Sequence, residues 1–418
     1  MNLKAQLTNM AKGAQEACRF MLSVSSVTKN EVLKSMALGL MSKKDYILKA
    51  NKKDIAKARG AGLSSAFIDR LTLTEKRIKE MSASLLEIAK LDDPTGEVIK
   101  AWRRPNALWI HKVRVPLGVI AIIYESRPNV TSDCIGLCFK SGNSVILRGG
   151  REALNSNLSI YQVLKEVVKS YGLPEAIVNM VATGNRRAVD ILLKLNNYID
   201  VVIPRGGEEL IRRVSKSSRI PVIKHYKGIC HTYVDDWADL NMAEKICYNA
   251  KVQRPGVCNA MESMLVHKDV AARFLPGMLK KFKQAKVEIR GCPITQKIVK
   301  NIKKATNKDY ETEYLDLILS VKVVQDLGDA IRHINYYGSH HSDTIITDNY
   351  ENALEFLKQV DSACVYVNAS TRFTDGNQFG MGAEIGISTD KLHARGPMAL
   401  EELTTYKYMV FGSGQVRE

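Results

Sequence analysis

Short apolar runs alternate with amphipathic stretches between residues 118 and 225. The runs have the length of buried strands, and the stretches between them place apolar residues three or four positions apart, as helices do. We predict helices around 131–141, 153–170, 185–195 and 207–216. The five predicted strands are "GVIAIIY", "SVILRG", "VNMVA", "VVIPRG" and "PVIKH". This alternation predicts an α/β fold with a doubly wound parallel sheet, whose ligands bind beyond the carboxyl ends of its strands.

The segments on either side have other patterns. The first hundred residues predict helices, closed by the turn residues of "LDDPTGE". A hairpin with Pro105 and Asn106 in its turn follows, and its second arm alternates as a half-exposed strand does. The C-terminal segment "TTYKYMVFGSGQVRE" predicts one more strand. A chain of 418 residues with 45% hydrophobic content is long enough for two or more domains.

The formal net charge of +17 raises the hypothesis of a nucleic-acid-binding protein. However, the lysines are spread among acids along amphipathic stretches such as "MSKKDYILKANKKDIAKARG", which indicates solvated helix faces. We therefore expect no nucleic-acid partner, although a basic chain favours anionic small molecules. No apolar run approaches the ~20 residues that span a bilayer, so we expect no membrane association.

The eight cysteines are far apart and form no disulfide or zinc pattern, so we expect reduced thiols, a cytoplasmic protein and no metal site. Cys134 and Cys138 stand four residues apart, as on one apolar helix face, and we predict that both pack in the core. Cys258 differs because it follows a proline and a glycine in "VQRPGVCNAM". A thiol on such a turn is more accessible than one in a helix or strand.

Polar residues follow three of the predicted strands. Pro204, Arg205, Gly206 and Gly207 lead from a strand into a helix, where free N–H groups favour a phosphate. An ordinary strand–helix turn is the alternative. The three-glycine spacing of the usual dinucleotide fingerprint is missing, so a standard Rossmann dehydrogenase is not supported.

The other two strand ends carry arginines and an asparagine. Arg148 and Arg151 could hold an anionic cofactor group, or could be a solvated surface pair. Ser126, Arg127 and Asn129 follow a buried strand. The Asn129 amide could donate to a developing oxyanion, although asparagine after proline is often only a turn residue and helix cap.

Taken in order, these segments resemble the aldehyde dehydrogenase superfamily over nearly the whole chain, and within it the reductases that act on L-glutamate 5-phosphate. "RVPLGVIAIIYESRPNVTSD" resembles the strand that leads to the oxyanion asparagine, and "NAKVQRPGVCNAMESMLVH" resembles the segment with the nucleophile. "HINYYGSHHSDTIIT" is the most reductase-like stretch.

The resemblance implies an aldehyde dehydrogenase-like fold of two doubly wound parallel-sheet domains and a small β oligomerisation element. We expect an NADPH-binding domain over 1–101 and 116–228, and a catalytic domain over 229–398. The hairpin 102–115 and the C-terminal strand 399–418 would form the oligomerisation element. The resemblance therefore implies a homo-oligomer, and a glutamate 5-kinase is a further candidate partner.

The same resemblance implies a mechanism. Cys258 would displace phosphate from L-glutamate 5-phosphate, and the glutamyl thioester would accept hydride from NADPH to release L-glutamate 5-semialdehyde. Asn129 and the backbone N–H of Cys258 would hold the oxyanion. This reaction is the second step of proline biosynthesis. The alternatives are another acylating or hydrolytic aldehyde dehydrogenase, and a basic binding protein on an inactive enzyme scaffold.

The resemblance also assigns cofactor contacts. Arg148 stands at the position of the adenosine-ribose lysine, and Arg151, three residues later, stands where NAD-preferring relatives commonly carry a glutamate, which favours NADPH over NADH. Pro204, Arg205, Gly206 and Gly207 match the phosphate turn. "TEYLDLILSVKV" resembles the segment whose glutamate contacts the nicotinamide ribose, which assigns that role to Glu313.

Two further sets of residues are expected near the substrate. Hydrolytic relatives carry a water-activating glutamate in a Glu-Leu-Gly-Gly motif, whereas "HYKGICHTY" places His225 there and matches Gly228 to the second glycine. His225 could equally be a packed, hydrogen-bonded histidine. Arg127 could hold the substrate carboxylate or the phosphate, or could be a structural ion-pair partner. The remaining candidate substrate contacts are Ser126, Ser339, His341, Ser342 and Asp343.

Overall fold

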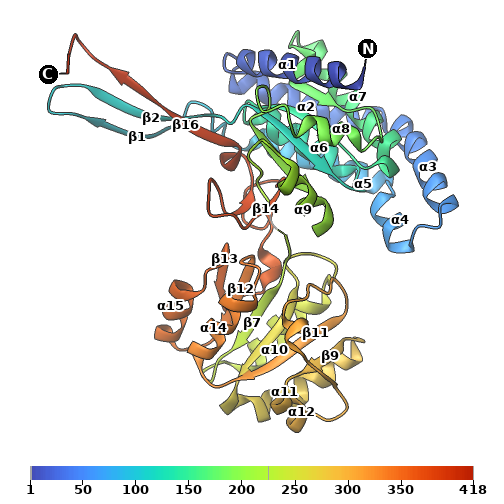
Figure 1. Cartoon of the computed structure of the whole chain (residues 1–418), viewed down its shortest axis with the longest axis vertical. Coiled ribbons are helices and arrows are strands. Elements are labelled where there is room, and N and C mark those ends of the chain that lie inside the picture. The colour runs from blue at the N-terminus through green and yellow to red at the C-terminus, as the bar shows by residue number, and fades with distance from the viewer. Residues whose placement is uncertain (1, 225, 418) are drawn as a thin grey trace. The chain divides into compact units, whose positions relative to one another are not determined.

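The computed structural model describes residues 2–224 and 226–417, which divide into two compact units (Figure 1). Unit 1 comprises residues 1–224, 380–386 and 398–418, and unit 2 comprises 225–379 and 387–397. The segment 380–386, which the sequence analysis assigned to the catalytic domain, therefore belongs to unit 1. No helix in the described ranges has the length and apolar character needed to cross a membrane.

Unit 1 begins with helices, as predicted. Serine, threonine and asparagine caps start four of the five, and each cap accepts a hydrogen bond from a backbone N–H of the first turn. The helices are α1 (Leu3–Met21), α2 (Ser26–Ser42), α3 (Lys44–Gly60), α4 (Ser65–Leu71) and α5 (Glu75–Lys90).

A four-stranded parallel sheet follows, with strand order β5-β4-β3-β6. Its elements are β3 (Val119–Tyr124), α6 (Asn129–Lys140), β4 (Ser144–Arg148), η1 (Arg151–Ala153), α7 (Leu154–Ser170), η2 (Glu175–Ile177), β5 (Val178–Met180), α8 (Arg187–Leu192), β6 (Val201–Arg205) and α9 (Glu208–Ser217). The predicted doubly wound pattern is confirmed up to α9. Cys134 and Cys138 are buried on α6, which confirms their predicted core packing.

The predicted strand "PVIKH" is wrong as a strand, because its described residues form only an isolated parallel bridge between Val222 and Val202. Pro221 accepts from Val202 N, and Ile223 donates back to Val202 O. Proline lacks an N–H, so it cannot extend a ladder on both sides.

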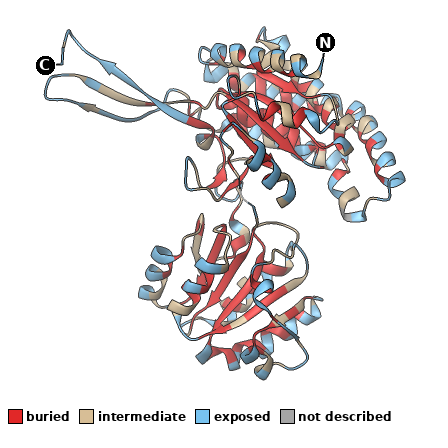
Figure 2. Cartoon of the chain, viewed as in Figure 1, coloured by how far each residue is buried: buried red, intermediate tan, exposed pale blue. Residues whose placement is uncertain are grey.

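Both faces of this sheet are covered by helices. Val119, Ala121 and Ile123 of β3 pack in one cluster with Leu7 of α1 and Ala188 of α8. The alternate side chains of β3 point to the opposite face, where Tyr124 Oη lies 2.7 Å from Thr131 Oγ1 of α6. Every residue of β3 is therefore buried, as Figure 2 shows.

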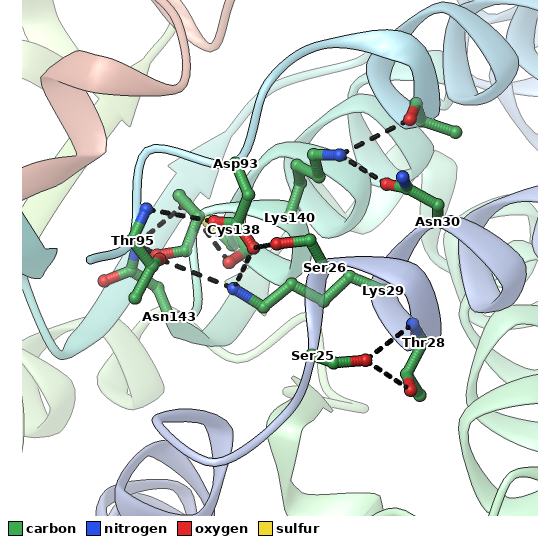
Figure 3. A network of polar contacts seen from close by, with 12 residues as sticks. Ser25, Ser26, Thr28, Lys29, Asn30, Asp93, Thr95, Cys138, Lys140 and Asn143 are labelled. Carbon is green, nitrogen blue, oxygen red and sulfur yellow. Dashed lines mark hydrogen bonds and ion pairs between the residues drawn. The ribbon is translucent and has the colours of Figure 1, made fainter. Parts of the chain in front are cut away.

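A buried ion pair joins α2 to the segment that follows α5 (Figure 3). Lys29 Nζ donates to Asp93 Oδ2 at 2.8 Å, and the two side chains are only 1% and 6% exposed. Ser26 Oγ donates to the same carboxylate at 2.9 Å, and Thr95 N donates to its other oxygen at 3.0 Å. These donors hold the pKa of Asp93 below its usual value although burial opposes the shift. The pair fixes α2 against the segment that leads into the hairpin.

The predicted hairpin is confirmed, and the C-terminal strand pairs with it. β1 (Val98–Arg103), β2 (Trp109–Pro116) and β16 (Thr404–Phe411) form an antiparallel three-stranded sheet in the order β1-β2-β16. Figure 1 shows these strands extending together away from the helices of unit 1. The side chains of β1 and β16 are largely exposed and those of β2 are mostly half-buried, unlike those of the parallel sheet (Figure 2).

Unit 2 contains a seven-stranded sheet in the order β10-β9-β11-β8-β7-β12-β13, and every pairing in it is parallel. The strands are β7 (Cys230–Val234), β8 (Met261–His267), β9 (Glu288–Gly291), β10 (Lys303–Lys304), β11 (Ile318–Val324), β12 (Ser342–Ile346) and β13 (Cys364–Val367). The helices are α10 (Leu240–Val252), α11 (Lys268–Gln284), α12 (Pro293–Ile298), α13 (Asn307–Tyr310), α14 (Leu327–Tyr337) and α15 (Tyr350–Gln359).

Two apolar clusters cover the two faces of this sheet. Met264 of β8 packs with Phe274 of α11, whereas its neighbour Leu265 packs with Ile334 of α14 and Phe356 of α15. Short elements complete the chain: η3 (Thr371–Phe373), β14 (Gly386–Ser388), β15 (Gly396–Met398) and η4 (Glu401–Leu403).

Candidate active site

Cys258 lies on a turn between the end of α10 and the start of β8. It is half-buried, whereas six of the other seven cysteines are fully buried. Asn259 and Ala260, the next two residues, are buried and lead directly into β8. The turn therefore presents the Cys258 side chain from a backbone whose following residues are fixed in the core of unit 2.

The segment before β7 packs closely against this turn. A Cβ on Gly228 would lie 1.9 Å from the carbonyl oxygen of Cys258 and 2.5 Å from its Cα. Only a glycine permits that approach, because real Cβ contacts never come so close. Gly228 was singled out in the sequence as the second glycine of a motif, and the structure gives the physical reason for a glycine there.

A second cysteine also contacts the turn. The Cys230 thiol donates to the carbonyl oxygen of Cys258 at 3.2 Å, and its Sγ lies 3.7 Å from His341 Nδ1. Burial raises the pKa of the Cys230 thiol well above its ordinary value. Cys230 therefore stays protonated and acts as a donor to the turn. The sequence analysis grouped it with the other reduced thiols.

The side chain of Asn259 anchors the turn to the segment around η3. Asn259 Nδ2 donates to Thr374 O at 2.8 Å, and Thr371 Oγ1 donates to Asn259 O at 2.8 Å. Arg372 donates from Nη1 to Asn259 Oδ1 and from Nε to Gln253 Oε1, the latter at 3.0 Å. Arg372 thus contacts residues on both sides of Cys258. Sequence reasoning missed Asn259 and Arg372, although Asn259 is adjacent to the predicted nucleophile.

The candidate substrate contacts of "YYGSHHSDT" lie in the same unit as Cys258, and two of them connect with it through a chain of contacts. His341 Nδ1, which lies near Cys230, is 2.8 Å from Ser342 Oγ. Ser342 Oγ is 2.6 Å from Thr374 Oγ1. His341 and Ser342 are fully buried, so they support the Cys258 turn from the interior of unit 2.

The remaining two candidates of that stretch differ from each other. Ser339 is half-buried, and its Oγ accepts from Ile229 N at 2.8 Å. Asp343 is fully buried: one oxygen accepts from His231 N at 2.7 Å and contacts His231 Nδ1 at 2.9 Å, and the other accepts from Ser362 Oγ. The hydrogen-bonding capacity of the Asp343 carboxylate is thus directed to protein groups.

Glu313 is tied to the glycine that contacts Cys258. Glu313 Oε1 accepts from Gly228 N at 2.9 Å. The strand–loop segment around it is held by Glu262, whose Oε1 accepts from Leu315 N at 3.0 Å and whose Oε2 accepts from Lys251 Nζ at 2.6 Å. Lys251 and Glu262 are both completely buried, and burial raises the pKa of Glu262 to about 7. Unit 2 therefore brings Cys258, Gly228 and Glu313 into one cluster.

In unit 1, Asn129 is the first residue of α6 and is exposed. Its Nδ2 lies 3.4 Å from Asp133 Oδ2, and Ser84 Oγ donates to Asp133 Oδ1 at 2.9 Å. Burial raises the pKa of Asp133 to about 6, although both hydrogen bonds act against the rise. The contact with Asp133, a residue one helical turn along, restrains the Asn129 amide.

The segment before that helix forms a tight turn at Ser126 and Arg127. Ser126 is buried and has a φ of +26°, which non-glycine residues rarely adopt. Arg127 N donates to Glu125 O at 2.6 Å, and the Arg127 residue is exposed. Backbone strain of this kind concentrates at functional sites, where the surrounding structure maintains it.

Arg148 and Arg151 have different environments. Arg148 is only 9% exposed, and its Nη2 donates to Gly184 O at 3.1 Å. Its buried Nε has no hydrogen-bond partner within the described chain. Burial lowers the pKa of Arg148, and the charges of Arg186 and Arg213 add to that effect. Arg151 is exposed beside Glu152, 3.1 Å away. Arg148, Arg186 and Arg213 therefore interact electrostatically near the end of β4, and of these three the sequence identified only Arg148.

The predicted phosphate turn leads from β6 into α9. Gly207 is the N-cap of α9, and its N–H donates to Glu125 Oε2 at 2.9 Å. A Cβ on Gly206 would lie 2.4 Å from that same oxygen. A carboxylate is thus placed against the positive end of the helix, the position that favours an anion. Pro204 and Arg205 are the last two residues of β6. Sequence reasoning missed Glu125.

The predicted site residues thus belong to both units. Asn129, Ser126, Arg127, Arg148, Arg151 and the 204–207 turn lie in unit 1, whereas Cys258, Glu313, Ser339 and the 341–343 stretch lie in unit 2. His225 lies outside the described residues.

Comparison with known proteins identifies the family. The aldehyde dehydrogenase family model matches residues 3–296. The chain is 56% identical to the gamma-glutamyl phosphate reductase of Thermodesulfovibrio yellowstonii over 418 residues, which is 100% of both chains. The crystal structure of the Thermotoga maritima protein of that name superposes with a TM-score of 0.96 at 47% identity, covering 98% of this chain and 99% of the other. An acetylating aldehyde dehydrogenase from Geobacillus thermoglucosidasius has a TM-score of 0.70 at 15% identity, with 100% and 98% coverage, and shares the fold. The chain therefore belongs to the aldehyde dehydrogenase family and, within it, to the gamma-glutamyl phosphate reductases.

Proposed function

We propose that this protein reduces L-glutamate 5-phosphate to L-glutamate 5-semialdehyde and phosphate with NADPH, through a thioester on Cys258. The observation that carries the proposal is the match over the full length, at 56% identity, to proteins named for this reaction. The turn chemistry supports it, since Cys258 is a partly accessible thiol in a turn fixed by Gly228, Cys230 and Asn259. A fixed backbone orients the Cys258 thiol for attack, and the thiol stays accessible for reaction.

The first chemical step forms the C–S bond. The Cys258 thiolate attacks the acyl carbon, and the C–O bond to phosphate breaks with its electron pair on the leaving phosphate. Negative charge gathers on the carbonyl oxygen as the tetrahedral intermediate forms. We assign the backbone N–H of Cys258 and the Asn129 amide as donors to this oxygen. Asp133 restrains that amide from within α6.

The residues of unit 1 fit a nicotinamide dinucleotide with a 2′-phosphate. The cofactor supplies the hydride that reduces the thioester. Arg148 offers a buried, unpartnered Nε, and Arg151 offers an exposed guanidinium three residues later. Gly207 N at the N-terminus of α9 donates to the Glu125 carboxylate, which supports the assignment of an anion to this end of the helix. We assign the Pro204–Gly207 turn to the pyrophosphate and Glu313 to the nicotinamide ribose.

Substrate contacts follow from exposure and hydrogen bonding. Arg127 is exposed at a strained turn and suits the substrate carboxylate, and Ser126 shapes that turn. Ser339 retains its hydroxyl proton as a donor because its oxygen accepts from Ile229 N. We assign His341, Ser342 and Asp343 to the support of the site, because all three are completely buried. The proposed role of His225 in place of a water-activating glutamate rests on sequence alone.

The β1-β2-β16 sheet is the proposed oligomerisation element, and its partner is a second copy of the chain. Apolar side chains are exposed along it, including Trp109 at 50%, Tyr408 at 55% and Phe411 at 54%. An exposed apolar sheet of this kind marks an interaction surface in a stable protein. Substitution of Phe411 by aspartate should lower the molar mass measured by light scattering, whereas retention of the wild-type mass would exclude this strand.

The deciding experiment measures NADP⁺ reduction by glutamate semialdehyde with and without inorganic phosphate. The proposed reaction, run in reverse, requires phosphate to release the acyl group from Cys258. Cys258→Ala should abolish turnover while NADPH binding remains. Turnover without phosphate, with glutamate as product, would identify a hydrolytic aldehyde dehydrogenase instead. Turnover that requires coenzyme A would identify an acylating one.

A further inference from the structure

We propose that Arg372 is a catalytic residue: its guanidinium stabilises the Cys258 thiolate and holds the phosphoryl group that Cys258 displaces. This inference rests on the proposed thioester reaction but concerns a residue outside the nucleophile segment. Arg372 lies in η3, more than a hundred residues after Cys258 in the chain.

Hydrogen bonds hold the guanidinium against the nucleophile turn. Nε donates to Gln253 Oε1 at 3.0 Å, and Nη1 donates to Asn259 Oδ1. Gln253 and Asn259 flank Cys258, so the cation lies beside the turn that carries the thiol. The two amide oxygens that accept these bonds also orient the planar guanidinium, and a preorganised cation loses little freedom when it binds an anion.

The charge of Arg372 is not neutralised by either of these bonds. Both acceptors are amide oxygens, and neither of them carries a negative charge. Burial lowers the pKa of the Arg372 guanidinium and the charge of Arg254 lowers it further, while Cys258 and Asp375 raise it. A half-buried cation without an ion-pair partner is costly unless an anion compensates it. The Cys258 thiolate and a phosphate are the anions that the proposed reaction supplies.

The same cation serves both stages of the acyl transfer. Before attack, its positive charge favours the thiolate over the thiol of Cys258. During attack, the C–S bond forms and the C–O bond to the phosphate breaks. The phosphate departs with the electron pair, and the guanidinium offers N–H donors in the geometry that matches phosphate oxygens. Arg372 therefore stabilises charge that passes from sulfur to phosphate.

Other titratable groups also face Cys258 in unit 2. Arg254 and Asp375 act on Arg372, the buried Cys230 thiol donates to the Cys258 carbonyl, and His341 lies behind Cys230. Glu313 accepts from Gly228, which packs on the Cys258 backbone. A test of Arg372 must therefore change its charge while these groups stay in place.

The experiment measures the rate of Cys258 alkylation by iodoacetamide against pH in the full chain, with the modified residue identified by peptide mass. Arg372→Gln should slow alkylation at neutral pH and so move the profile to higher pH, because an adjacent cation is lost. Arg372→Lys should restore most of the shift, since it keeps the charge. Arg332→Gln, which removes an exposed arginine of α14, should leave the profile unchanged.

Phosphate provides a second measurement that does not depend on turnover. Inorganic phosphate should slow alkylation of the wild-type protein, and the concentration needed should rise about tenfold in Arg372→Lys, which lacks the bidentate fork. In the phosphate-dependent oxidation assay, the KM for phosphate should rise more than that for the aldehyde.

An unchanged alkylation profile in Arg372→Gln, with native thermal unfolding, would overturn the inference even if activity fell. If Arg372→Gln does not fold, equal phosphate protection in wild type and Arg372→Lys would overturn it. Full turnover by Cys258→Ala would instead refute the proposed function, and the alkylation profile of the wild-type thiol would still report on Arg372.

Discussion

Gly228 and the backbone of Cys258 are in direct contact, so close that a Cβ on the glycine would lie 1.9 Å from the Cys258 carbonyl oxygen. The same carbonyl accepts the Cys230 thiol at 3.2 Å. One short segment, 228–230, therefore fixes the turn that carries Cys258 from two sides. The position of Cys258 depends on a residue that carries no side chain.

Gly228→Ala should lower kcat/KM by at least tenfold and destabilise the protein by about 1–3 kcal/mol, because backbone atoms cannot yield to the new methyl group. Steady-state kinetics and urea unfolding check both effects. Gly277→Ala is the matched control, since nothing lies within 4 Å of that Cβ and the position is inside α11. Equal activity of Gly228→Ala and wild type would mean that the turn is not held by this contact.

Asn129→Ala should fold normally and lower kcat by roughly 10²–10³, the usual effect of removing one oxyanion donor. Stopped-flow or steady-state assays of semialdehyde oxidation measure it, and circular dichroism checks the fold. Ser84→Ala removes a hydrogen bond to Asp133 but leaves the Asn129 amide in place, so its effect on kcat should be much smaller. A loss below threefold in Asn129→Ala would assign Asn129 to helix structure alone.

Arg151→Glu should weaken NADPH binding by roughly tenfold or more, because a charge-assisted contact to phosphate becomes a repulsion. NADH binding should change far less. Fluorescence titration of both cofactors measures the ratio, and Arg19→Glu on α1 provides the same charge change at an exposed position of the same unit. An unchanged NADPH/NADH ratio would remove Arg151 from the cofactor site.

Asp133 should make stability depend on pH. Its pKa in the folded protein is about 6, above the ordinary value of 3.8, so the folded state binds the proton more tightly. The stabilisation that comes from this tighter proton binding is fully present below about pH 4 and is lost as pH rises through about 6. The measurement is the free energy of urea unfolding of wild type and Asp133→Asn at pH 4.5 and 7.5. The difference between the two proteins should change by on the order of 1 kcal/mol between these pH values, a figure reduced by partial solvent exposure.

The neutral variant should gain relative stability at the higher pH. A difference between the two proteins that does not vary with pH would show that Asp133 titrates normally. Glu87→Gln, an exposed change on the neighbouring helix α5, serves as the control for loss of a surface carboxylate.

The sequence by itself determined most elements of unit 1 and their order, because strands and helices follow local periodicity, whereas the sheet of unit 2 was expected only from the family resemblance. "GVIAIIY" is a fully buried strand, and alternation with helices required a parallel sheet. The turn at Cys258 was evident from Pro255 and Gly256. The strand prediction for "PVIKH" was wrong because the apolar pattern does not take into account that proline lacks the N–H needed in a strand ladder.

Only the tertiary structure decided which side chains share an environment. Arg372 and Asn259 meet across more than a hundred residues of chain, and Glu125 reaches Gly207 across β3 and β6. The fold likewise gives two neighbouring candidates different environments: Asp343 is buried in contact with His231, whereas Ser339, four residues earlier, is half-buried. Such contacts arise from packing of distant segments, for which local periodicity carries no information. Hence the sequence located the candidate nucleophile Cys258, and the fold determined which side chains share its environment.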